Sequence, residues 1–302
     1  MSQASFVAVD WGTTSFRLWV MDADANILAT TTGPYGMSQL KPDDYDRVLE
    51  ETLQKLGFAR DIPVIISGMA GAAQGWCEAP YLSAPTQLDE LGTGAVRVGN
   101  SSHEVRILPG VKQVSPANVM RGEETQIAGL LRHSPDFGGT VCLPGTHTKW
   151  VRISNRAIIE FETCLTGEQF AFFSETSVLS HSMIDDGWDD NAFEAAVRLA
   201  TEDPLAVPRR LFAIRAEMLV ARQSCAQARA TLSGLLIGQE LMAVPRYWQG
   251  QDVTLIGAYA LCELYSKALA ITGGAASILD VTAMTLAGLT AAYQQQKESA
   301  NA

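Results

Sequence analysis

The first part of the chain alternates between apolar and polar positions in a way that predicts a strand meander. Residues 6–12 begin with an apolar run and end in a polar turn, and an alternation of apolar residues follows over 16–22. A third run covers 26–32, after a turn rich in Asp and Asn, which tolerate turn geometry. Such patterns are typical of β-strands. We therefore predict three consecutive strands, with the tight turn Asp-Trp-Gly-Thr-Thr-Ser between the first two.

Apolar residues at helical spacing and short apolar runs define the rest of the chain. The spacing predicts helices at 42–57, 122–132, most of 168–245, 258–270 and 279–297. The apolar runs predict strands at 63–71, 140–154, 157–163 and 252–257. Four prolines interrupt 72–118, so we expect this segment to be rich in loops.

The order of these elements favours an α/β protein with two domains of mixed sheet. The segment HSPDFGG at 133–139 is the predicted boundary. The expected domains are therefore 1–133 and 134–302, and the last helix is free to pack back on the first of them. The helix at 232–242 is unusually apolar, which fits either a core or an interface, so a homodimer stays open.

Composition and charge argue against some classes of partner. The chain has 302 residues, 47% hydrophobic and 18% charged, and a net charge of -11. Nucleic-acid binding needs a basic stripe, so we expect no nucleic-acid partner. No apolar run approaches the roughly 20 residues that span a bilayer, and the N-terminus lacks a signal-peptide pattern, so we expect no membrane association. Five scattered cysteines without a CxxC pair predict a reduced, cytoplasmic protein.

Two turns of similar sequence lie one in each predicted domain. The segment VAVDWGTTSFRLWV aligns with VCLPGTHTKWV when Trp11 is skipped, and Asp10 then corresponds to Pro144. The aligned glycine and hydroxyl residues are Gly12 with Gly145, Thr13 with Thr146, and Ser15 with Thr148. Each segment is a strand, a glycine turn and a second strand, which suggests duplicated domains.

A pair of such turns has a specific chemical use. Glycine lets backbone N–H groups approach an anion closely, and hydroxyl groups add donors, so the two turns could hold the β- and γ-phosphates of a nucleotide. Asp10 could then hold Mg²⁺ through water, because Mg²⁺ keeps several waters. A plain hairpin is the alternative for either turn alone. The chain has neither a P-loop nor a Rossmann glycine motif.

Longer segments resemble the 2-dehydro-3-deoxygalactonokinase family of the actin-like ATPase and sugar kinase superfamily. The resemblance runs from about residue 5 to 290. It rests on DWGTTSFRLW, SGMAG followed by GW, APYLSAP, NVMRGEETQIAG, LPGTHTKWV, LTGE, LSGLLIGQE and TLIGAYALCELYSKAL. It implies two actin-like, ribonuclease H-like domains with mixed sheets around an ATP cleft. The sugar-acid site would lie in the first domain and the nucleotide site in the second.

The implied activity is that of a transferase. ATP, with Mg²⁺, would phosphorylate 2-dehydro-3-deoxy-D-galactonate to its 6-phosphate in galactonate breakdown by the De Ley-Doudoroff route. A kinase of the same superfamily acting on another keto-deoxy sugar acid or a polyol is one alternative. A non-catalytic actin-like ATP-binding protein is another. The sequence leaves the galacto or gluco stereochemistry of the substrate open.

The resemblance also implies which residues act in catalysis. Related sugar kinases carry the catalytic base at the start of the crossing helix, which here is Glu123 or Glu124, and we favour Glu123. Both could instead be first-turn acids that stabilise the helix dipole. Asp10 is the expected metal-binding residue. Lys149 could offset charge on the transferring phosphoryl group or be an exposed sheet lysine. His147 could bond a phosphate or only fill its turn, and Gly257 could lie against the adenosine or only end its strand. The expected cofactor-binding residues are Gly12, Thr13, Thr14, Gly145, Thr146, His147, Thr148, Lys149 and Gly257.

The keto-acid carboxylate calls for a fork-shaped donor, which is Arg. Arg17 could point toward the substrate or lie solvated on the sheet face. Arg121 could bind the carboxylate, contact the γ-phosphate or pair with Glu123. Trp76 could form the floor of the sugar site or belong to the core. The expected substrate-binding residues are Arg17, Gly68, Met69, Ala70, Gly71, Trp76 and Arg121.

Overall fold

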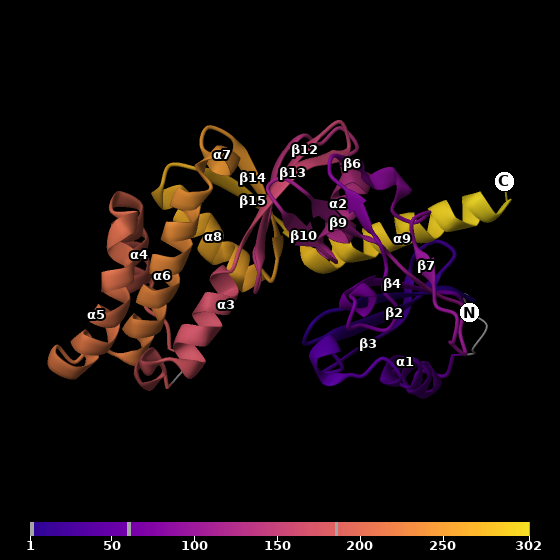
Figure 1. Ribbon diagram of the computed structural model, residues 1–302, viewed down its shortest axis with the longest axis horizontal. Helices are drawn as coiled ribbons and strands as arrows, with labels where there is room; N and C mark the ends of the chain where they lie inside the picture. The colour runs from indigo at the N-terminus through magenta and orange to yellow at the C-terminus, as the bar shows by residue number, and fades with distance from the viewer. Residues whose placement is uncertain (1–2, 59–61, 185–186, 302) are drawn as a thin grey trace. The chain divides into compact units, whose positions relative to one another are not determined.

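The computed structural model describes residues 3–58, 62–184 and 187–301, which form two compact units (Figure 1). Unit 1 comprises Met1–Gly138, Ile153–Glu160 and Val281–Ala302. Unit 2 comprises Gly139–Arg152 and Phe161–Asp280. The chain thus returns to unit 1 twice after first leaving it, and we describe each unit by itself.

The central sheet of unit 1 has the strand order β3-β2-β1-β4-β8-β7. Antiparallel pairing joins β1 to β2 and β2 to β3, as the predicted meander requires, whereas β1 runs parallel to β4. The strands are β1 (Ala4–Trp11), β2 (Phe16–Asp22), β3 (Ile27–Gly33), β4 (Val64–Gly68), β7 (Val96–Arg97) and β8 (Val105–Ile107). Because β1 and β4 are parallel neighbours, Asp10, one residue before the end of β1, and Gly68, at the end of β4, lie at the carboxyl ends of adjacent strands.

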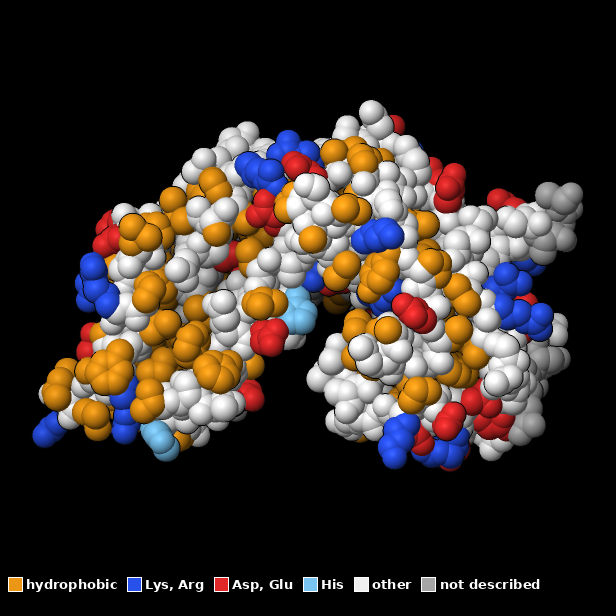
Figure 2. Space-filling view, viewed as in Figure 1, with side chains coloured by type: hydrophobic (Ala, Val, Ile, Leu, Met, Phe, Trp, Pro, Cys, Tyr) orange, Lys and Arg blue, Asp and Glu red, His pale blue; other side chains and the backbone are white. Residues whose placement is uncertain are grey.

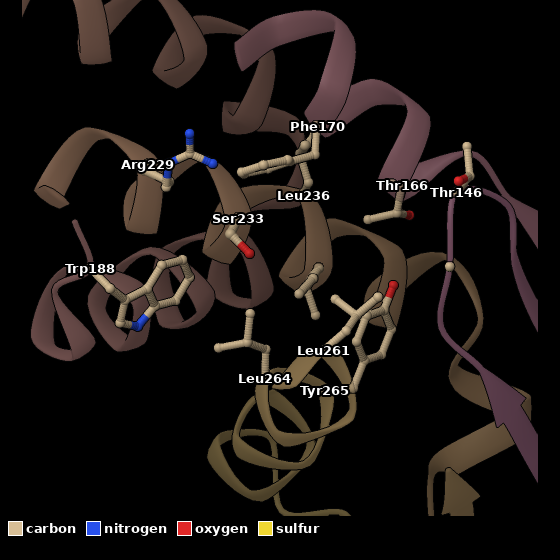
Figure 3. Close-up of a pocket in the computed structure, with 13 residues that line it drawn as sticks. Thr146, Thr166, Phe170, Trp188, Arg229, Ser233, Leu236, Leu261, Leu264 and Tyr265 are labelled. Atoms are coloured by element: carbon tan, nitrogen blue, oxygen red, sulfur yellow. The ribbon is translucent and has the colours of Figure 1, made fainter. Parts of the chain in front are cut away.

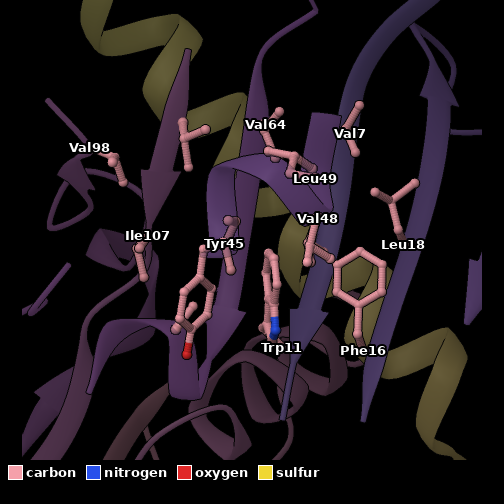
Figure 4. Close-up of a cluster of buried hydrophobic side chains, with 14 of the residues drawn as sticks. Val7, Trp11, Phe16, Leu18, Tyr45, Val48, Leu49, Val64, Val98 and Ile107 are labelled. Atoms are coloured by element: carbon pink, nitrogen blue, oxygen red, sulfur yellow. The ribbon is translucent and has the colours of Figure 1, made fainter. Parts of the chain in front are cut away.

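An aromatic core packs helix α1 (Asp44–Lys55) against one face of this sheet. Trp11 is fully buried, with ring centroids 4.7 Å from Tyr45 and 4.6 Å from Phe16 (Figure 4). Val48 and Leu49, one turn after Tyr45, reach the same cluster, because residues three and four apart share a helix face. The buried Trp11 side chain therefore anchors β1 in the core directly after Asp10.

Helix α2 (Glu123–His133) packs along the C-terminal helix α9 (Val281–Asn301), which also contacts β1 and β4 (Figure 1). A Cβ atom on Gly129 would lie 1.9 Å from the carbonyl oxygen of Met284, and one on Gly288 would lie 1.9 Å from that of Thr125. Glycine is therefore required at both crossings. This close packing fixes the first turn of α2, which carries Glu123 and Glu124.

The segment expected to be loops contains short strands as well. A three-stranded sheet in unit 1 has the order β10 (Asn118–Met120), β9 (Gly110–Gln113) and β5 (Tyr81–Ser83). Strand β6 (Thr86–Gln87) pairs with Ala157 and Ile158 of β13. These strands of two to four residues are too short to leave a period in the sequence, so the expectation of loops over 72–118 was partly wrong.

Unit 2 is built on β15, β14, β11 and the parts of β12 and β13 outside Ile153–Glu160, and in it β11, β14 and β15 run parallel. The strands are β11 (Gly139–Leu143), β12 (Thr148–Ser154), β13 (Ala157–Cys164), β14 (Asp252–Gly257) and β15 (Ala275–Asp280). Strand β15 was not predicted, because its small residues follow two glycines and resemble a turn. The turn between β11 and β12 is the second copy identified in the sequence.

The helices of unit 2 lie between β13 and β15 in the chain. They are α3 (Thr166–Ala171), α4 (Asp190–Glu202), α5 (Val207–Val220), α6 (Cys225–Ala243), α7 (Pro245–Trp248) and α8 (Tyr259–Ile271). Short 3₁₀ or π turns are η1 (Met37–Gln39), η2 (Met69–Gly71) and η3 (Leu88–Glu90) in unit 1, and η4 (Phe172–Thr176), η5 (Val178–Ser182) and η6 (Pro204–Ala206) in unit 2.

The apolar helix at 232–242 lies in α6 and is part of the core. Ser224 and Gln227 begin α6 with a capping box. Gly234 and Gly238 let α6 approach α4 closely, since Cβ atoms there would lie 2.5 Å and 3.0 Å from its carbonyl oxygens. Core packing thus accounts for the apolar character of 232–242.

The surface shows two further features. Helix α5 exposes apolar side chains, seen as orange atoms over α5 in Figure 2. Lysine and arginine side chains on this face are interspersed with acidic ones (Figure 2). In the described part of the chain, no helix combines the length and the apolar character that crossing a bilayer requires.

Candidate functional site

The first glycine turn, between β1 and β2, is a tight hairpin supported from one side. The Gly12 N–H donates to the Ser15 carbonyl at 2.8 Å and closes the turn. The backbone N–H groups of Met37 and Ser38 donate to the carbonyls of Gly12 and Thr13 at 3.0 and 2.9 Å. The carbonyl groups of Gly12, Thr13 and Ser15 therefore accept hydrogen bonds, whereas the side chains of Thr13 and Thr14 are exposed, as an anion-binding turn requires.

Asp10 and Arg17 form an ion pair across the β1–β2 ladder, where they are register partners. Both bonds, from Nε at 3.1 Å and from a terminal nitrogen, end on Oδ2 of Asp10. The Oδ1 atom lies beside Gly68, 3.5 Å from where a Cβ atom of that residue would be. Asp10 thus keeps one carboxylate oxygen, of the kind that Mg²⁺ prefers, outside the ion pair.

Two glycines with backbone conformations that favour glycine meet next to Asp10. Gly68 ends β4 with φ +98°, and Gly122 precedes α2 with φ +110°. A Cβ atom on Gly68 would lie 2.6 Å from the Trp11 carbonyl oxygen, and one on Gly122 would lie 3.5 Å from the Cα atom of Gly68. Sequence reasoning included Gly68 but missed Gly122. Only glycine adopts these conformations readily, so both positions favour it.

The two acids of α2 have different environments. Glu124 is fully buried, and both of its carboxylate oxygens accept from the Gly122 N–H, at 2.8 and 2.9 Å. Burial, aided by the charge of Glu123, raises the pKa of Glu124 to about 7. Glu123 is half-buried, and its Oε2 accepts from the Arg121 N–H at 3.0 Å. Both acids therefore bind backbone N–H groups just before the helix, but only Glu123 keeps part of its surface open to a ligand.

Arg121 lies almost fully buried, at 9% exposure, under the loop that follows β4. One terminal nitrogen donates to the Ala79 carbonyl at 2.8 Å, and the guanidinium lies 4.3 Å from the ring centroid of Tyr81. Its Nε and Nη1 atoms have no hydrogen-bond partner among the described residues. Unsatisfied buried donors on a cation are costly, so these two nitrogens fit an anionic ligand or an ordered water.

The loop after β4 is mostly packed inward. Ala70 is fully buried in the core, and a Cβ atom on Gly71 would lie 2.8 Å from Nη1 of Arg121. Trp76 stacks on Tyr45 with ring centroids 5.8 Å apart, as the core alternative expects. Met69 remains partly exposed. The structure therefore brings Gly71 and Arg121 together, while Ala70 and Trp76 support the loop from the core.

The second glycine turn, between β11 and β12, differs from the first in the burial and the contacts of its side chains. Gly145 is half-buried and Thr146 is exposed. His147 pairs with Glu168 at the surface, 2.6 Å apart. Lys149 is 4% exposed and its Nζ donates to the His147 carbonyl at 3.3 Å, so the exposed-lysine alternative is wrong.

Thr148 was expected to face a phosphate, but the structure buries it completely. Its hydroxyl bonds to the hydroxyl of Tyr265 at 2.9 Å, and the Gly145 N–H lies 3.5 Å from the same oxygen. Thr148 thus supports the turn from below and does not line its outer surface. Gly257 also packs against this turn, since a Cβ atom there would lie 3.0 Å from the Pro144 carbonyl oxygen.

A cavity of about 410 Å³ lies directly beside the second turn in unit 2 (Figure 3). Gly145 and Thr146 line it, together with apolar and aromatic side chains. Sequence reasoning assigned no role to most of its lining: Thr166, Gly167, Phe170, Trp188, Arg229, Ser233, Leu236, Ile237, Leu261, Leu264 and Tyr265. The quoted segments LTGE, LSGLLIGQE and TLIGAYALCELYSKAL contain some of these residues, which is the signal that could have found them.

Three comparisons with known proteins bear on the family. A family model described as 2-keto-3-deoxy-galactonokinase matches residues 10–292. A Rhizobium meliloti (strain 1021) protein named "Probable 2-dehydro-3-deoxygalactonokinase DgoK1" is 37% identical over 293 residues, which cover 95% of this chain and 96% of that relative. A 2-dehydro-3-deoxygalactonokinase of Escherichia coli (strain K12) is 33% identical over 289 residues, 93% of each chain. A Sinorhizobium meliloti crystal structure of the same kinase name has a TM-score of 0.90 at 37% identity, covering 96% of this chain and 98% of that one.

A more distant solved structure has the same fold. The activator of 2-hydroxyisocaproyl-CoA dehydratase from Clostridium difficile, with bound ADPNP, has a TM-score of 0.55 at 15% identity and covers 98% of this chain. At this identity the likeness shows the fold alone, and with the mixed sheets it confirms the predicted actin-like α/β class. The match over nearly the whole length and two relatives above 30% identity confirm the resemblance seen in the sequence: the chain belongs to the 2-keto-3-deoxy-galactonokinase family.

Proposed function

We propose that the protein transfers the γ-phosphoryl group of ATP to the 6-hydroxyl of 2-dehydro-3-deoxy-D-galactonate. Unit 1 carries the sugar-acid site and the metal-binding carboxylate, and unit 2 carries the nucleotide site. The observation that supports this most strongly is the convergence of Asp10, Gly68 and the first turn of α2 at the carboxyl ends of two parallel strands. In open α/β sheets, ligands bind at that edge.

The cavity of unit 2 suits the adenosine of ATP. Its volume of about 410 Å³ lies within the usual range of ligand pockets, about 300–1,000 Å³. Phe170 and Trp188 offer aromatic faces to a base, while Arg229 and Ser233 offer polar groups (Figure 3). Because Gly145 and Thr146 line the same cavity, a nucleotide bound there would extend its phosphates toward the second turn. Lys149 supplies a cation at that turn.

The first turn and Asp10 would hold the metal and the transferring group. Asp10 fits Mg²⁺ because its Oδ1 lies outside the ion pair with Arg17. Bound there, Mg²⁺ would neutralise charge on the phosphates, as phosphoryl transfer requires. The hydroxyls of Thr13 and Thr14 and their backbone N–H groups add donors for the phosphate oxygens.

Glu123 acts as the base. It accepts the proton of the sugar 6-hydroxyl while the bond from that oxygen to the γ-phosphorus forms. The bond between the γ-phosphorus and the bridging oxygen breaks, and that oxygen leaves with ADP. Glu124 is the weaker candidate, because its carboxylate is fully buried and both oxygens are held by the Gly122 N–H.

Arg121 binds the keto-acid carboxylate. Arg17, the other candidate, is already paired with Asp10, whereas two nitrogens of Arg121 have no partner among the described residues. A carboxylate would satisfy them and would offset the cost of burying the guanidinium. ATP as cosubstrate and five free cysteines fit action in the cytoplasm.

A coupled assay of ADP release tests this function. Purified protein is given ATP, Mg²⁺ and one acceptor at a time: 2-dehydro-3-deoxy-D-galactonate, its C4 epimer, its reduced analogue and its decarboxylated analogue. We expect ADP release with the first acceptor, and a kcat/KM at least about tenfold lower without the carboxylate. Equal rates with and without the carboxylate would contradict the carboxylate site and favour a kinase of broader substrate range. Absence of turnover with every acceptor would favour a non-catalytic ATP-binding protein.

A further inference from the structure

Glu240 on α6 is a buried carboxylate to which the proposed reaction assigns no role. It is 4% exposed and lies in the core of unit 2. It accepts hydrogen bonds from the Trp150 indole N–H at 2.6 Å, from the Tyr265 hydroxyl at 2.8 Å and from the Thr166 hydroxyl. No described cation forms an ion pair with it. Burying a carboxylate without a cation is costly, so these three bonds must account for its being there.

Each of the three donors belongs to an element that supports the second glycine turn. Tyr265 on α8 bonds to Thr148 at 2.9 Å, and Thr148 lies at the end of the turn. Trp150 follows Thr148 by two residues on β12. Thr166 begins α3, whose backbone packs directly on the turn.

The contact between α3 and the turn is close. The Glu168 N–H donates to the Thr146 carbonyl at 2.9 Å. A Cβ atom on Gly167 would lie 2.3 Å from the Gly145 carbonyl oxygen, so only glycine fits there. Glu240 therefore links three supports of one turn, although it contacts none of the turn's exposed residues.

The carboxylate also sets the direction of the hydrogen-bond chain. When Glu240 is ionised it only accepts, so the Tyr265 hydroxyl then donates to Glu240 and its oxygen accepts from the Thr148 hydroxyl. The Thr148 oxygen is then left as an acceptor toward the Gly145 N–H at 3.5 Å. The bonds of the whole chain thus point from the turn toward Glu240.

We propose that Glu240 is a positioning residue that holds the phosphate-binding turn 144–149 in shape through Tyr265, Thr166 and Trp150. It would thereby set the affinity for the phosphates of a nucleotide without touching them. This inference rests on the proposed nucleotide site of unit 2. Burial raises the pKa of Glu240 to about 7, while its three hydrogen bonds oppose that rise.

The test compares a ligand that has phosphates with one that has none. Calorimetric titration measures the binding of adenosine and of a non-hydrolysable ATP analogue to the full-length wild type, Glu240→Gln and Tyr265→Phe. Tyr265→Phe removes the hydroxyl that bonds to Glu240 and Thr148 but keeps the ring that lines the cavity, so it keeps the test valid if Glu240→Gln fails to fold. Cys142→Ala is the matched control, since Cys142 is fully buried in the same core but takes no part in the chain of hydrogen bonds.

We expect both network variants to bind the ATP analogue about tenfold more weakly and adenosine within about twofold of wild type. The KM for ATP should rise by a similar factor while the KM for the sugar acid stays unchanged. Cys142→Ala should leave the ratio of the two affinities as in wild type.

Two results would overturn the inference. Equal weakening of both ligands by Glu240→Gln and Tyr265→Phe would make Glu240 a support of the cavity wall only. Unchanged affinities in both variants would remove the link altogether. A wild type that binds neither ligand would instead overturn the nucleotide site itself, and this inference with it.

Discussion

Arg17 and Asp10 are register partners on neighbouring strands, and both hydrogen bonds between them end on one oxygen, Oδ2 of Asp10. A hydrogen bond between Gly12 and Ser15 closes the turn between β1 and β2. The side chains of Asp10 and Arg17 therefore lie side by side on the same face of the sheet. The ion pair gives the two carboxylate oxygens of Asp10 different surroundings: Oδ2 accepts from Arg17, and Oδ1 lies beside Gly68. Asp10 is thereby oriented before any ligand arrives.

The first prediction concerns Asp10. Asp10→Asn keeps the shape of the side chain but removes the charge that would hold Mg²⁺, so we expect kcat to fall by a hundredfold or more, about the range of a lost electrostatic contribution. Steady-state kinetics over a range of Mg²⁺ concentrations measures it. Asp24→Asn, an exposed acid outside the site, is the control and should behave as wild type. Near-normal turnover in Asp10→Asn would refute the metal role.

The second prediction separates the two arginines. Arg17→Gln removes a cation beside Asp10, so half-maximal activity should need less Mg²⁺, while the KM for the sugar acid stays within about threefold. Arg121→Lys removes the fork-shaped donor, so the KM for the sugar acid should rise by about tenfold or more. If the two variants exchange these effects, Arg17 binds the carboxylate and our assignment is wrong.

The third prediction distinguishes the two acids of α2. Glu123→Gln should lower kcat by about a hundredfold or more with little change in the KM for ATP, because general-base catalysis contributes at that scale. Glu124→Gln should have a much smaller effect on kcat, since that carboxylate is buried and held by Gly122. Rapid-quench measurement of the transfer step isolates the chemistry. The opposite order of effects would assign the base to Glu124.

The fourth prediction follows from the raised pKa of Glu124. The folded protein holds this proton up to about pH 7, whereas the unfolded chain releases it near the ordinary pKa of 4.5. The group's contribution to stability is therefore complete below pH 4.5 and is lost as the pH rises through 7. Between these values the free energy of unfolding should fall by about 1.4 kcal/mol per pH unit from this group.

Urea unfolding of wild type and Glu124→Gln at about pH 5 and about pH 8 measures this effect. The glutamine variant does not titrate, so its free energy of unfolding should change less with pH than that of wild type. A difference between the two proteins that is the same at both values would show that Glu124 titrates at its ordinary pKa when folded.

Much of the fold could be predicted from the sequence. Alternation over residues 5–32 predicted the meander, and counting back from a closed turn would also have paired Asp10 with Arg17. The strand β15 and the short strands after residue 80 escaped because small or very short strands leave no period. The cavity of unit 2 could not be foreseen, because its lining comes from segments between Gly145 and Tyr265 that only folding brings together.

The burial of individual site residues could not be predicted from the sequence around them. The same hydroxyl pattern occurs in both glycine turns, yet Ser15 is exposed while Thr148, the residue that aligns with it, is buried against Tyr265. A sequence alignment of the two turns cannot show this, because the burial depends on α8, far along the chain. Glu123 and Glu124 are likewise adjacent in sequence but differ in burial, since successive residues of a helix point in different directions.

The most direct test of the central claim is the identity of the product. Wild-type protein is incubated with ATP, Mg²⁺ and 2-dehydro-3-deoxy-D-galactonate, and the product is examined by phosphorus NMR and mass spectrometry. We predict a single phosphomonoester on the C6 oxygen, formed in a one-to-one ratio with ADP and at least about a hundredfold more slowly when Asp10→Asn replaces wild type. ADP formed without a phosphorylated sugar acid, or phosphate on another oxygen, would contradict the proposed function.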